Sequence, residues 1–400
     1  MKILNSLLFV GLLLVSSFSS MAEEEYKRKY NSIAELLKAN KLTHKDKSYL
    51  YMFVHPSYQV FDYSSARDFQ RSSIYTGTYE TAASLTEKIA DTLWGYDLNS
   101  VGHIQFAWYC NSRNDVYTGA TGYTGEEDDQ VSKMIDQGWG LTAMLADFKD
   151  GSFEPEHYVT EDLETSWHNE EGYFWMAVEV DKSQCFNATF FIEDFIQKAP
   201  SVFSFNRDPE KFEGGVCSSV AASFFRHAKT EYQSMIDATH RSVRISKEVL
   251  GNVPSAKLPE AVDLPDFAEN LEEKKVDKMR LILRPIEFNP KRNYENFNFY
   301  DPELMAFMIR RLEAEYIGGK SKMMSRKKIQ LNESRNHFSR RETGYRQRRY
   351  STNYVEVSRK TDSSYQAVYD AVRRFKRNNP GMKVSRKSIE GKPGIVIERN

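Results

Sequence analysis

The chain has 400 residues, and its 55 Lys or Arg nearly balance its 56 Asp or Glu. The charge is unevenly distributed, because residues 301–400 hold 24 basic against 11 acidic residues while the rest of the chain is acidic. Three cysteines are too few for a disulfide-rich scaffold, and beyond the N-terminal residues no stretch reaches the roughly 18 apolar residues that a membrane span needs.

Residues 1–22 have the pattern of a secretory signal peptide. Met1 and Lys2 supply a positive start, residues 7–15 form a short apolar core, and residues 20–22 form a small-x-small cleavage site. A retained membrane anchor is the alternative. The pattern predicts a mature protein that is exported to the periplasm or the extracellular space.

Residues 23–250 alternate short strand and helix patterns, which predicts one large α+β domain. Expected helices lie at residues 27–46, 81–93, 126–135 and 181–198, the last with Phe190, Phe191, Phe195 and Ile196 on its buried side. Expected strands lie at residues 49–54, 103–110, 116–122, 140–148 and 172–180. The turn-rich residues 111–115 predict a hairpin between the second and third of these strands.

Cys217 follows two glycines and directly precedes a helical pattern. Apolar residues recur there every three or four positions, and the helix is expected to run towards Leu250 and to stop at Gly251. A helix start offers free N–H groups and the positive end of the helix dipole, which favour a thiolate. The sequence therefore predicts a reactive thiol, and a small buried apolar side chain is the alternative.

Residues 251–300 are punctuated by prolines and predict a linker or a wrapping segment. One strand is expected within it, at residues 280–286. The basic residues 301–400 are expected to form a C-terminal extension, with helices at 301–316 and 364–377, a hairpin at 383–398 and a flexible stretch at 318–350.

A thiol needs a base within hydrogen-bond reach to act as a nucleophile. Among the eight histidines, His103 stands out because it follows a glycine and opens a predicted strand, which would hold its ring rigidly. A structural role for this histidine is the alternative. Cys110 and Cys185 could pair and leave Cys217 as the free thiol, but the sequence alone does not establish this pairing.

The order of these motifs resembles the circularly permuted papain-like superfamily, which includes lecithin retinol acyltransferase and the periplasmic Lnb-type cysteine hydrolase-like domains. The resemblance is carried by residues 101–104 around His103, by the helix at 181–198 and by residues 215–219 around Cys217. It covers about residues 45–250. It implies an antiparallel sheet packed on a helix that starts with the cysteine.

The resemblance also implies roles for single residues. Cys217 would be the nucleophile, and His103 would take up its proton and later protonate the leaving group. A third polar residue on the neighbouring strand would orient His103. Counting along the hairpin places it near Thr118, with Asp115 as the alternative, although this family often has histidine, an amide or an acid there. Backbone N–H groups of Cys217 and Ser218 would stabilise the oxyanion.

We therefore expect cysteine-dependent acyl-enzyme chemistry, either hydrolysis (as an amidase or peptidase) or acyl transfer, on cell-wall peptides or lipid acyl groups. The alternative is a catalytically inactive protein that binds the cell envelope through the same cleft and the basic tail. No cofactor or metal is expected. The basic C-terminal region is expected to dock on anionic lipid head groups or acidic envelope polymers, or else to be a solvated surface. Nucleic acid is not an expected partner of an exported protein.

Overall fold

The computed structural model describes residues 28–55, 102–112, 115–125, 138–164, 174–251, 262–263, 274–276, 291–317 and 363–399. The predicted signal peptide lies outside these residues. So do the helices expected at 81–93 and 126–135, the strand expected at 280–286 and the segment 318–350.

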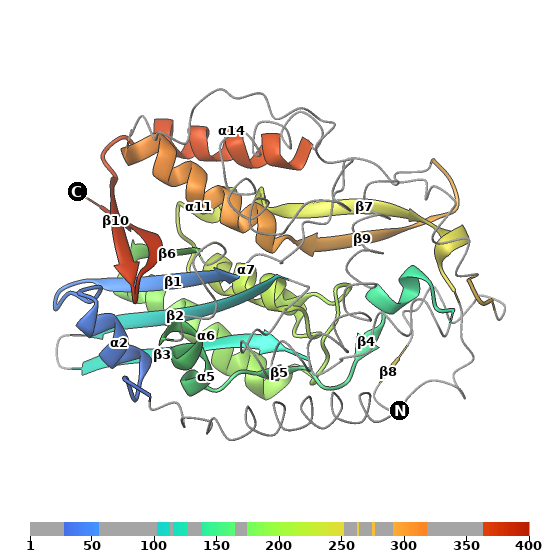
Figure 1. Cartoon of the computed structure of the whole chain (residues 1–400), viewed down its shortest axis with the longest axis horizontal. Coiled ribbons are helices and arrows are strands. Elements are labelled where there is room, and N and C mark those ends of the chain that lie inside the picture. The colour runs from blue at the N-terminus through green and yellow to red at the C-terminus, as the bar shows by residue number, and fades with distance from the viewer. Residues whose placement is uncertain are drawn as a thin grey trace, which may run out of the picture.

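A seven-stranded sheet forms the centre of the described molecule, in the order β10-β11-β6-β1-β2-β3-β5 (Figure 1). Its strands are β1 (Ser48–His55), β2 (His103–Ser112), β3 (Asp115–Thr124), β5 (Ser152–Phe153), β6 (Phe174–Val180), β10 (Lys383–Ile389) and β11 (Lys392–Glu398). All neighbours pair antiparallel except β11 and β6, which run parallel. The fold is thus α+β as expected, but the expectation of a purely antiparallel sheet was wrong at this one pair.

Helices cover both faces of the sheet. One face packs against α6 (Lys182–Lys198), α7 (Cys217–His227), α8 (Gln233–Asp237), α11 (Pro302–Ile317) and α14 (Ser363–Asn378). The other face packs against α2 (Ile33–Ala39) and α5 (Glu156–Glu164). In the central strand β1, Leu50 and Met52 point to the first face while Tyr51 and Phe53 point to the second. This is why β1 reads as a continuous apolar run.

The helix that begins at Cys217 is shorter than predicted. It ends at His227, and Lys229 just beyond it has a left-handed backbone conformation with φ of 52°. The chain then forms α8 and a strand, β7 (His240–Ser246), in which buried and exposed residues alternate. That two-residue period fits a strand and not a helix. The apolar residues towards Leu250 therefore do not continue the helix.

The strand β7 pairs with β9 (Tyr294–Tyr300) in a two-stranded ribbon that extends beside the main sheet (Figure 1). The end of the predicted linker 251–300 is therefore a paired strand. The strand expected at 140–148 is mostly wrong, since a 3₁₀ turn η1 (Leu141–Met144) precedes a two-residue strand. Short elements complete the described chain: β4 (Asp147–Phe148), β8 (Val262–Asp263), η2 (Pro209–Lys211) and η3 (Lys247–Val249).

The buried side of α6 differs in part from the prediction. Phe191 and Phe195 are buried as expected, but Phe190 is 55% exposed and Ile196 is 60% exposed. The inward stripe is completed by Cys185, Ala188 and Ile192. These positions follow the helical spacing of three and four residues, which Phe190 and Ile196 do not share.

The described part of residues 301–400 belongs to the same core as the rest of the chain. The helices α11 and α14 lie side by side (Figure 1), and the predicted C-terminal hairpin is present as β10 and β11. Ile395 and Ile397 of β11 are buried with the residues of α7. This part is therefore not a separate extension. Of the 24 basic residues of this region, 13 fall within residues 318–362, which lie outside the described residues.

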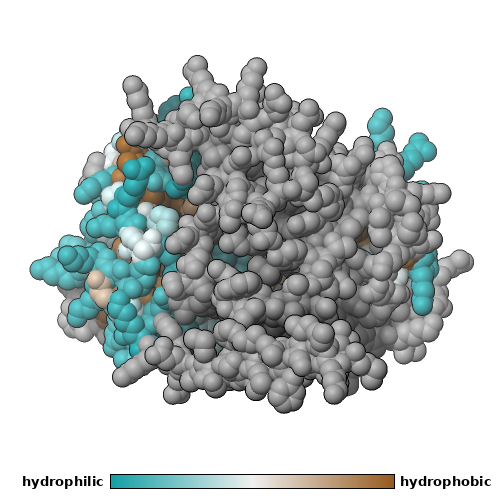
Figure 2. Space-filling model, in the orientation of Figure 1, coloured by the Kyte–Doolittle hydropathy of each residue, from teal (hydrophilic) through white to brown (hydrophobic). Residues whose placement is uncertain are grey.

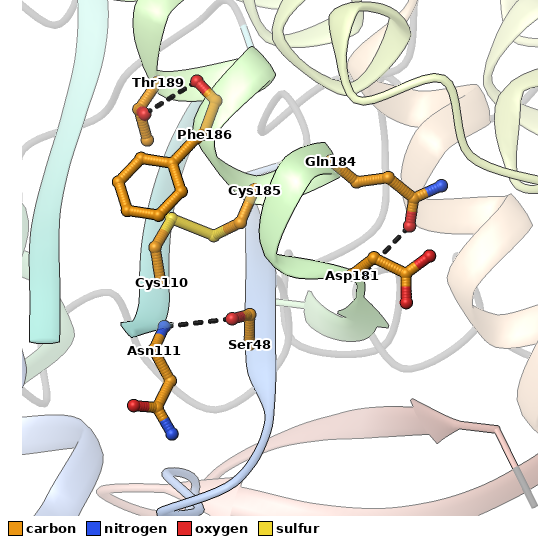
Figure 3. Close-up of a disulfide and its surroundings, with 8 residues drawn as sticks. All are labelled: Ser48, Cys110, Asn111, Asp181, Gln184, Cys185, Phe186 and Thr189. Carbon is orange, nitrogen blue, oxygen red and sulfur yellow. Dashed lines mark hydrogen bonds between the residues drawn. A yellow bond between two sulfur atoms is a disulfide. The ribbon is translucent and has the colours of Figure 1, made fainter. Parts of the chain in front are cut away.

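A disulfide bond joins Cys110 near the end of β2 to Cys185 in α6, with a Cα–Cα distance of 5.6 Å (Figure 3). Next to it, the N–H of Asn111 donates a hydrogen bond to Oγ of Ser48 on the neighbouring strand β1 at 2.9 Å. The disulfide bond anchors β2, the strand that begins with His103, to α6 on one face of the sheet. It also leaves Cys217 as the free thiol of the chain's three cysteines.

The described residues visible on the face in Figure 2 are mostly hydrophilic, with small hydrophobic patches between them. Among the helices that the structure describes, none combines the length and the apolar composition needed to cross a membrane.

Candidate active site

Cys217 is the first residue of α7, and the chain that leads to it is held on both sides. The N–H of Gly215 donates to the carbonyl oxygen of Val202 at 3.1 Å, and the carbonyl oxygen of Gly215 accepts from the N–H of Ser204 at 2.9 Å. Oγ of Ser219 accepts a hydrogen bond from the N–H of Val216 and so caps the helix start. Cys217 is buried, with 7% of the residue exposed. The position of Cys217 is therefore fixed by the hydrogen bonds of the segment that precedes α7.

His103 is the first residue of β2 and lies next to Cys217. The thiol lies close enough to the imidazole ring to raise its pKa, and Sγ lies 3.9 Å from the carbonyl oxygen of Gly102. The helix that carries Cys217 covers one face of the sheet, whereas the contacts of His103 described below lie towards the face covered by α5. The two predicted residues therefore meet at the end of the sheet, where β2 begins.

The acidic residue that contacts His103 is Glu154, just after β5. Nε2 of His103 and Oε1 of Glu154 are 2.9 Å apart, and the ring N–H is not aligned for a linear hydrogen bond, so the contact is an ion pair. The backbone of Glu154 is fixed to β3: its N–H donates to the carbonyl oxygen of Gly122 at 3.0 Å, and its own carbonyl accepts from Oγ1 of Thr121 at 2.8 Å. Since Nε2 faces Glu154, Nδ1 is the ring nitrogen left for Cys217.

The pKa of His103 lies well above its ordinary value of 6.5. Burial by itself lowers this pKa, but the charge of Glu154 and the interaction with Cys217 outweigh the effect of burial. The imidazolium form is therefore favoured at neutral pH. A proton that the thiol gives up is stabilised on this ring.

The two residues predicted to orient His103 do not reach it. Thr118 lies opposite Tyr109, and Asp115 lies opposite Ser112, next to the hairpin turn. Gly122 is the partner of Gln105, two residues beyond His103, so Thr118 is several residues too close to the turn. At about 3.3 Å per residue this separates Thr118 from His103 by more than 10 Å along the sheet. Counting outward from the pair of Ser112 and Asp115 places Thr124 opposite His103, so the predicted turn was correct and the count along the strands was wrong.

Glu154 was missed because no sequence signal points to it. The strand that precedes it has only two residues, too few to show a two-residue alternation. The strand pairs with β3 through Tyr123 and Phe153, and this pairing brings Glu154 to the end of the sheet beside His103, which is distant in the sequence.

The first N–H groups of an α-helix have no acceptor within the helix. In α7 these belong to Cys217 and Ser218, the two residues expected to supply oxyanion donors, and the structure places both at the helix start beside the sulfur. A carbonyl oxygen that approaches the thiol would meet the positive end of the helix dipole. The site thus combines a thiol, an imidazole paired with a carboxylate, and backbone donors.

Within the described ranges, no three His, Cys, Asp or Glu side chains gather closely enough to hold a metal ion. Comparison of the whole chain with protein-family models, with curated proteins and with solved structures finds no match. What the site can do must therefore be argued from its own chemistry.

Proposed function

We propose that this protein is an exported cysteine-dependent enzyme that forms an acyl-enzyme at Cys217 and then hydrolyses or transfers the acyl group. One observation carries the proposal: the free thiol at the start of α7 lies against the start of β2 beside His103, which contacts Glu154. A nucleophile, a base and a residue that orients the base are the parts that such chemistry requires. The arrangement agrees with the resemblance to the permuted papain-like superfamily.

Before the substrate reacts, the thiol proton of Cys217 passes to Nδ1 of His103, which gives the imidazolium form that the raised pKa of His103 favours. In the first step, the thiolate sulfur attacks the carbonyl carbon of an amide or ester. The electron pair of the C=O bond moves to oxygen, and the N–H groups of Cys217 and Ser218 stabilise the resulting oxyanion. When the C=O bond re-forms, the bond to the leaving nitrogen or oxygen breaks. His103 returns its proton to the leaving group, which leaves a thioester on Cys217.

In the second step, His103 takes a proton from water or from an acceptor alcohol or amine, whose oxygen or nitrogen attacks the thioester carbon. The C–S bond then breaks and the sulfur regains a proton from His103, which releases an acid or a transferred acyl product. Glu154 does not change its protonation state. It stabilises the imidazolium form that appears in both steps.

The proposed location and substrates have separate support. A disulfide between Cys110 and Cys185 suits an oxidising compartment, in agreement with the signal-peptide pattern at residues 1–22. Carbonyl compounds of the cell envelope, either cell-wall peptides or lipid acyl groups, are the substrates that this location offers. The basic residues of the C-terminal region would attract anionic lipid head groups or acidic envelope polymers.

The test is acylation of Cys217 by p-nitrophenyl acetate. We expect a burst of nitrophenol close to one equivalent of protein, together with an acetyl group on the peptide that contains Cys217 in mass spectrometry. Cys217→Ala should abolish both. Glu154→Gln should slow the burst while leaving the fold intact, because the side chain keeps its size.

The alternative function, envelope binding without catalysis, predicts a different result. If the wild-type protein shows no burst and Cys217→Ala still binds isolated cell envelopes as well as the wild type does, the site is a binding site and the proposal is wrong. Labelling of other residues with no acetyl on Cys217 would also contradict it.

A further inference from the structure

Gln105 is a buried amide that lies behind the carboxylate of Glu154. The residue is 0% exposed and lies in β2, between β1 and β3, two residues after His103. Its Nε2 donates to Oε2 of Glu154 at 2.9 Å and to Oδ2 of Asp162 in α5 at 2.7 Å. Its Oε1 lies 3.2 Å from Nε2 of His55. All three contacts are with groups from other elements of the fold.

The orientation of this amide follows from its partners. Only an NH₂ group can face two carboxylate oxygens, so Nε2 points towards Glu154 and Asp162 and the carbonyl oxygen points towards His55. That oxygen then requires a donor, so Nε2 of His55 carries a hydrogen. His55 stands opposite His103 in the register of β1 and β2, with ring centroids 6.1 Å apart. The amide is thus held at both ends.

The two oxygens of Glu154 therefore have different partners. Oε1 contacts His103, and Oε2 accepts from Gln105. A carboxylate held at one oxygen can rotate about its terminal bond, whereas one held at both cannot. Asp162 in turn fixes the second N–H of Gln105, which ties the arrangement to α5. His103, Glu154 and Gln105 form a chain that ends in a helix on the face opposite to α7.

We propose that Gln105 is a positioning residue of the thiol site, whose amide holds the Glu154 carboxylate in the orientation that keeps one oxygen on His103. This inference rests on the proposed function, because it assigns Gln105 a role in activating Cys217. Gln105 itself does not touch the thiol in this arrangement. Its effect reaches the sulfur through Glu154 and His103.

The experiment measures the rate at which iodoacetamide alkylates Cys217 as a function of pH. The disulfide protects the other two cysteines, so Cys217 is the one free thiol in the chain. In the wild type we expect fast alkylation well below pH 8.5, near which an ordinary thiol ionises. In Gln105→Leu, Glu154 loses a charge-assisted hydrogen bond, and we expect about a tenfold slower alkylation near pH 6 and a profile shifted to higher pH.

Two further variants keep the test decisive if Gln105→Leu does not fold. Gln105→Glu retains the size of the side chain but turns an oxygen towards two carboxylates, so the profile should shift in the same direction. Asp162→Asn leaves Gln105 an oxygen acceptor, and we expect a smaller shift of two- to threefold. The matched control is Thr189→Val, which removes a buried hydroxyl hydrogen bond to Phe186 in α6. It should lower stability and leave the profile unchanged.

The outcomes separate the two proposals. If wild-type Cys217 alkylates like an ordinary thiol, the proposed function is wrong and this inference with it. If the wild-type profile is shifted but folded Gln105 variants superpose on it, the proposed function stands and the positioning role of Gln105 is wrong. A shift in Thr189→Val equal to that in Gln105→Leu would also overturn the inference, because loss of stability alone would then explain it.

Discussion

The carboxylate of Glu154 occupies the space where a side chain at Gly122 would begin. A Cβ atom at Gly122 would lie 2.4 Å from Oε2 of Glu154 and 3.0 Å from Nε2 of His103. Gly122 pairs with Gln105 across the strands, and its missing side chain leaves the room into which Glu154 reaches. The glycine is needed here for space, not for an unusual backbone angle.

Gly122→Ala should therefore push Glu154 away from His103. We expect at least a tenfold loss in the rate of Cys217 alkylation near neutral pH, with most of the stability retained. The control is Gly391→Ala in the β10–β11 turn, where a Cβ meets no atom within 4 Å but φ is +85°. That variant should cost about 1 kcal/mol in stability and leave the alkylation rate unchanged. Equal rates of Cys217 alkylation in the two variants would show that a Cβ at Gly122 does not displace Glu154.

The ion pair between His103 and Glu154 should make stability depend on pH. The pKa of His103 is raised in the folded protein, so the stabilisation is fully present below its ordinary value of 6.5 and is lost as pH rises through the folded value. Glu154→Gln should lower the free energy of unfolding near pH 6 and have a diminishing effect towards alkaline pH. Urea unfolding at a series of pH values measures this.

Both proteins in that comparison should carry Cys217→Ala, so that no free thiol attacks the disulfide at alkaline pH. Among the groups that raise the pKa of His103, Glu154 makes the largest contribution. It is present in the Cys217→Ala reference protein and absent from the variant that also carries Glu154→Gln. A difference between the variants that grows with pH would show that the sign of the linkage is wrong.

Loss of the disulfide should destabilise the protein. Cys110 and Cys185 are separated by 75 residues, and closing a loop of that size contributes about 4 kcal/mol in the chain-entropy model. The double variant Cys110→Ser with Cys185→Ser should therefore unfold at a much lower urea concentration than the wild type. Cys217→Ser, which breaks no bond, is the matched control and should unfold near the wild-type midpoint.

A buried ion pair joins the β7–β9 ribbon to the start of α11. Nε of Arg241 donates to Oδ2 of Asp301, and Oδ1 of Asp301 accepts from the N–H of Glu303 at 2.8 Å. Arg241→Met should cost about 3–5 kcal/mol, because it leaves the buried carboxylate without its cation. Thermal unfolding measures the loss.

The control for that variant is an exposed pair, Lys198 with Asp194 in α6. Lys198→Met should change stability by about 0.5 kcal/mol or less. If Arg241→Met and Lys198→Met lost similar amounts of stability, burial would not explain the importance of the Arg241–Asp301 pair.

Local sequence patterns predicted much of the fold. The strands β1, β2, β3 and β6 and the helices α6, α11 and α14 each have enough residues to show their period, and their placement agrees with the prediction. The C-terminal hairpin was also predicted, since the turn at Glu390 and Gly391 separates two alternating segments. Long regular elements bury one face, and this leaves a readable pattern.

Long-range pairing could not be predicted in the same way. The sequence of β11 does not show that the strand pairs with β6 in addition to β10, its partner in the hairpin. At the site, Cys217 and His103 could be chosen from their local contexts, a helix start and a strand start. Glu154 depends on the pairing of a two-residue strand with β3, which only the three-dimensional structure supplies.

The parallel strand β11 also has a consequence for biosynthesis. A ribosome delivers residues 392–398 more than two hundred residues after β6, whose edge they cover. Until residues 392–398 emerge, that apolar edge has unpaired N–H and C=O groups. A prematurely terminated product would thus expose an aggregation-prone strand that proteolytic quality control can recognise.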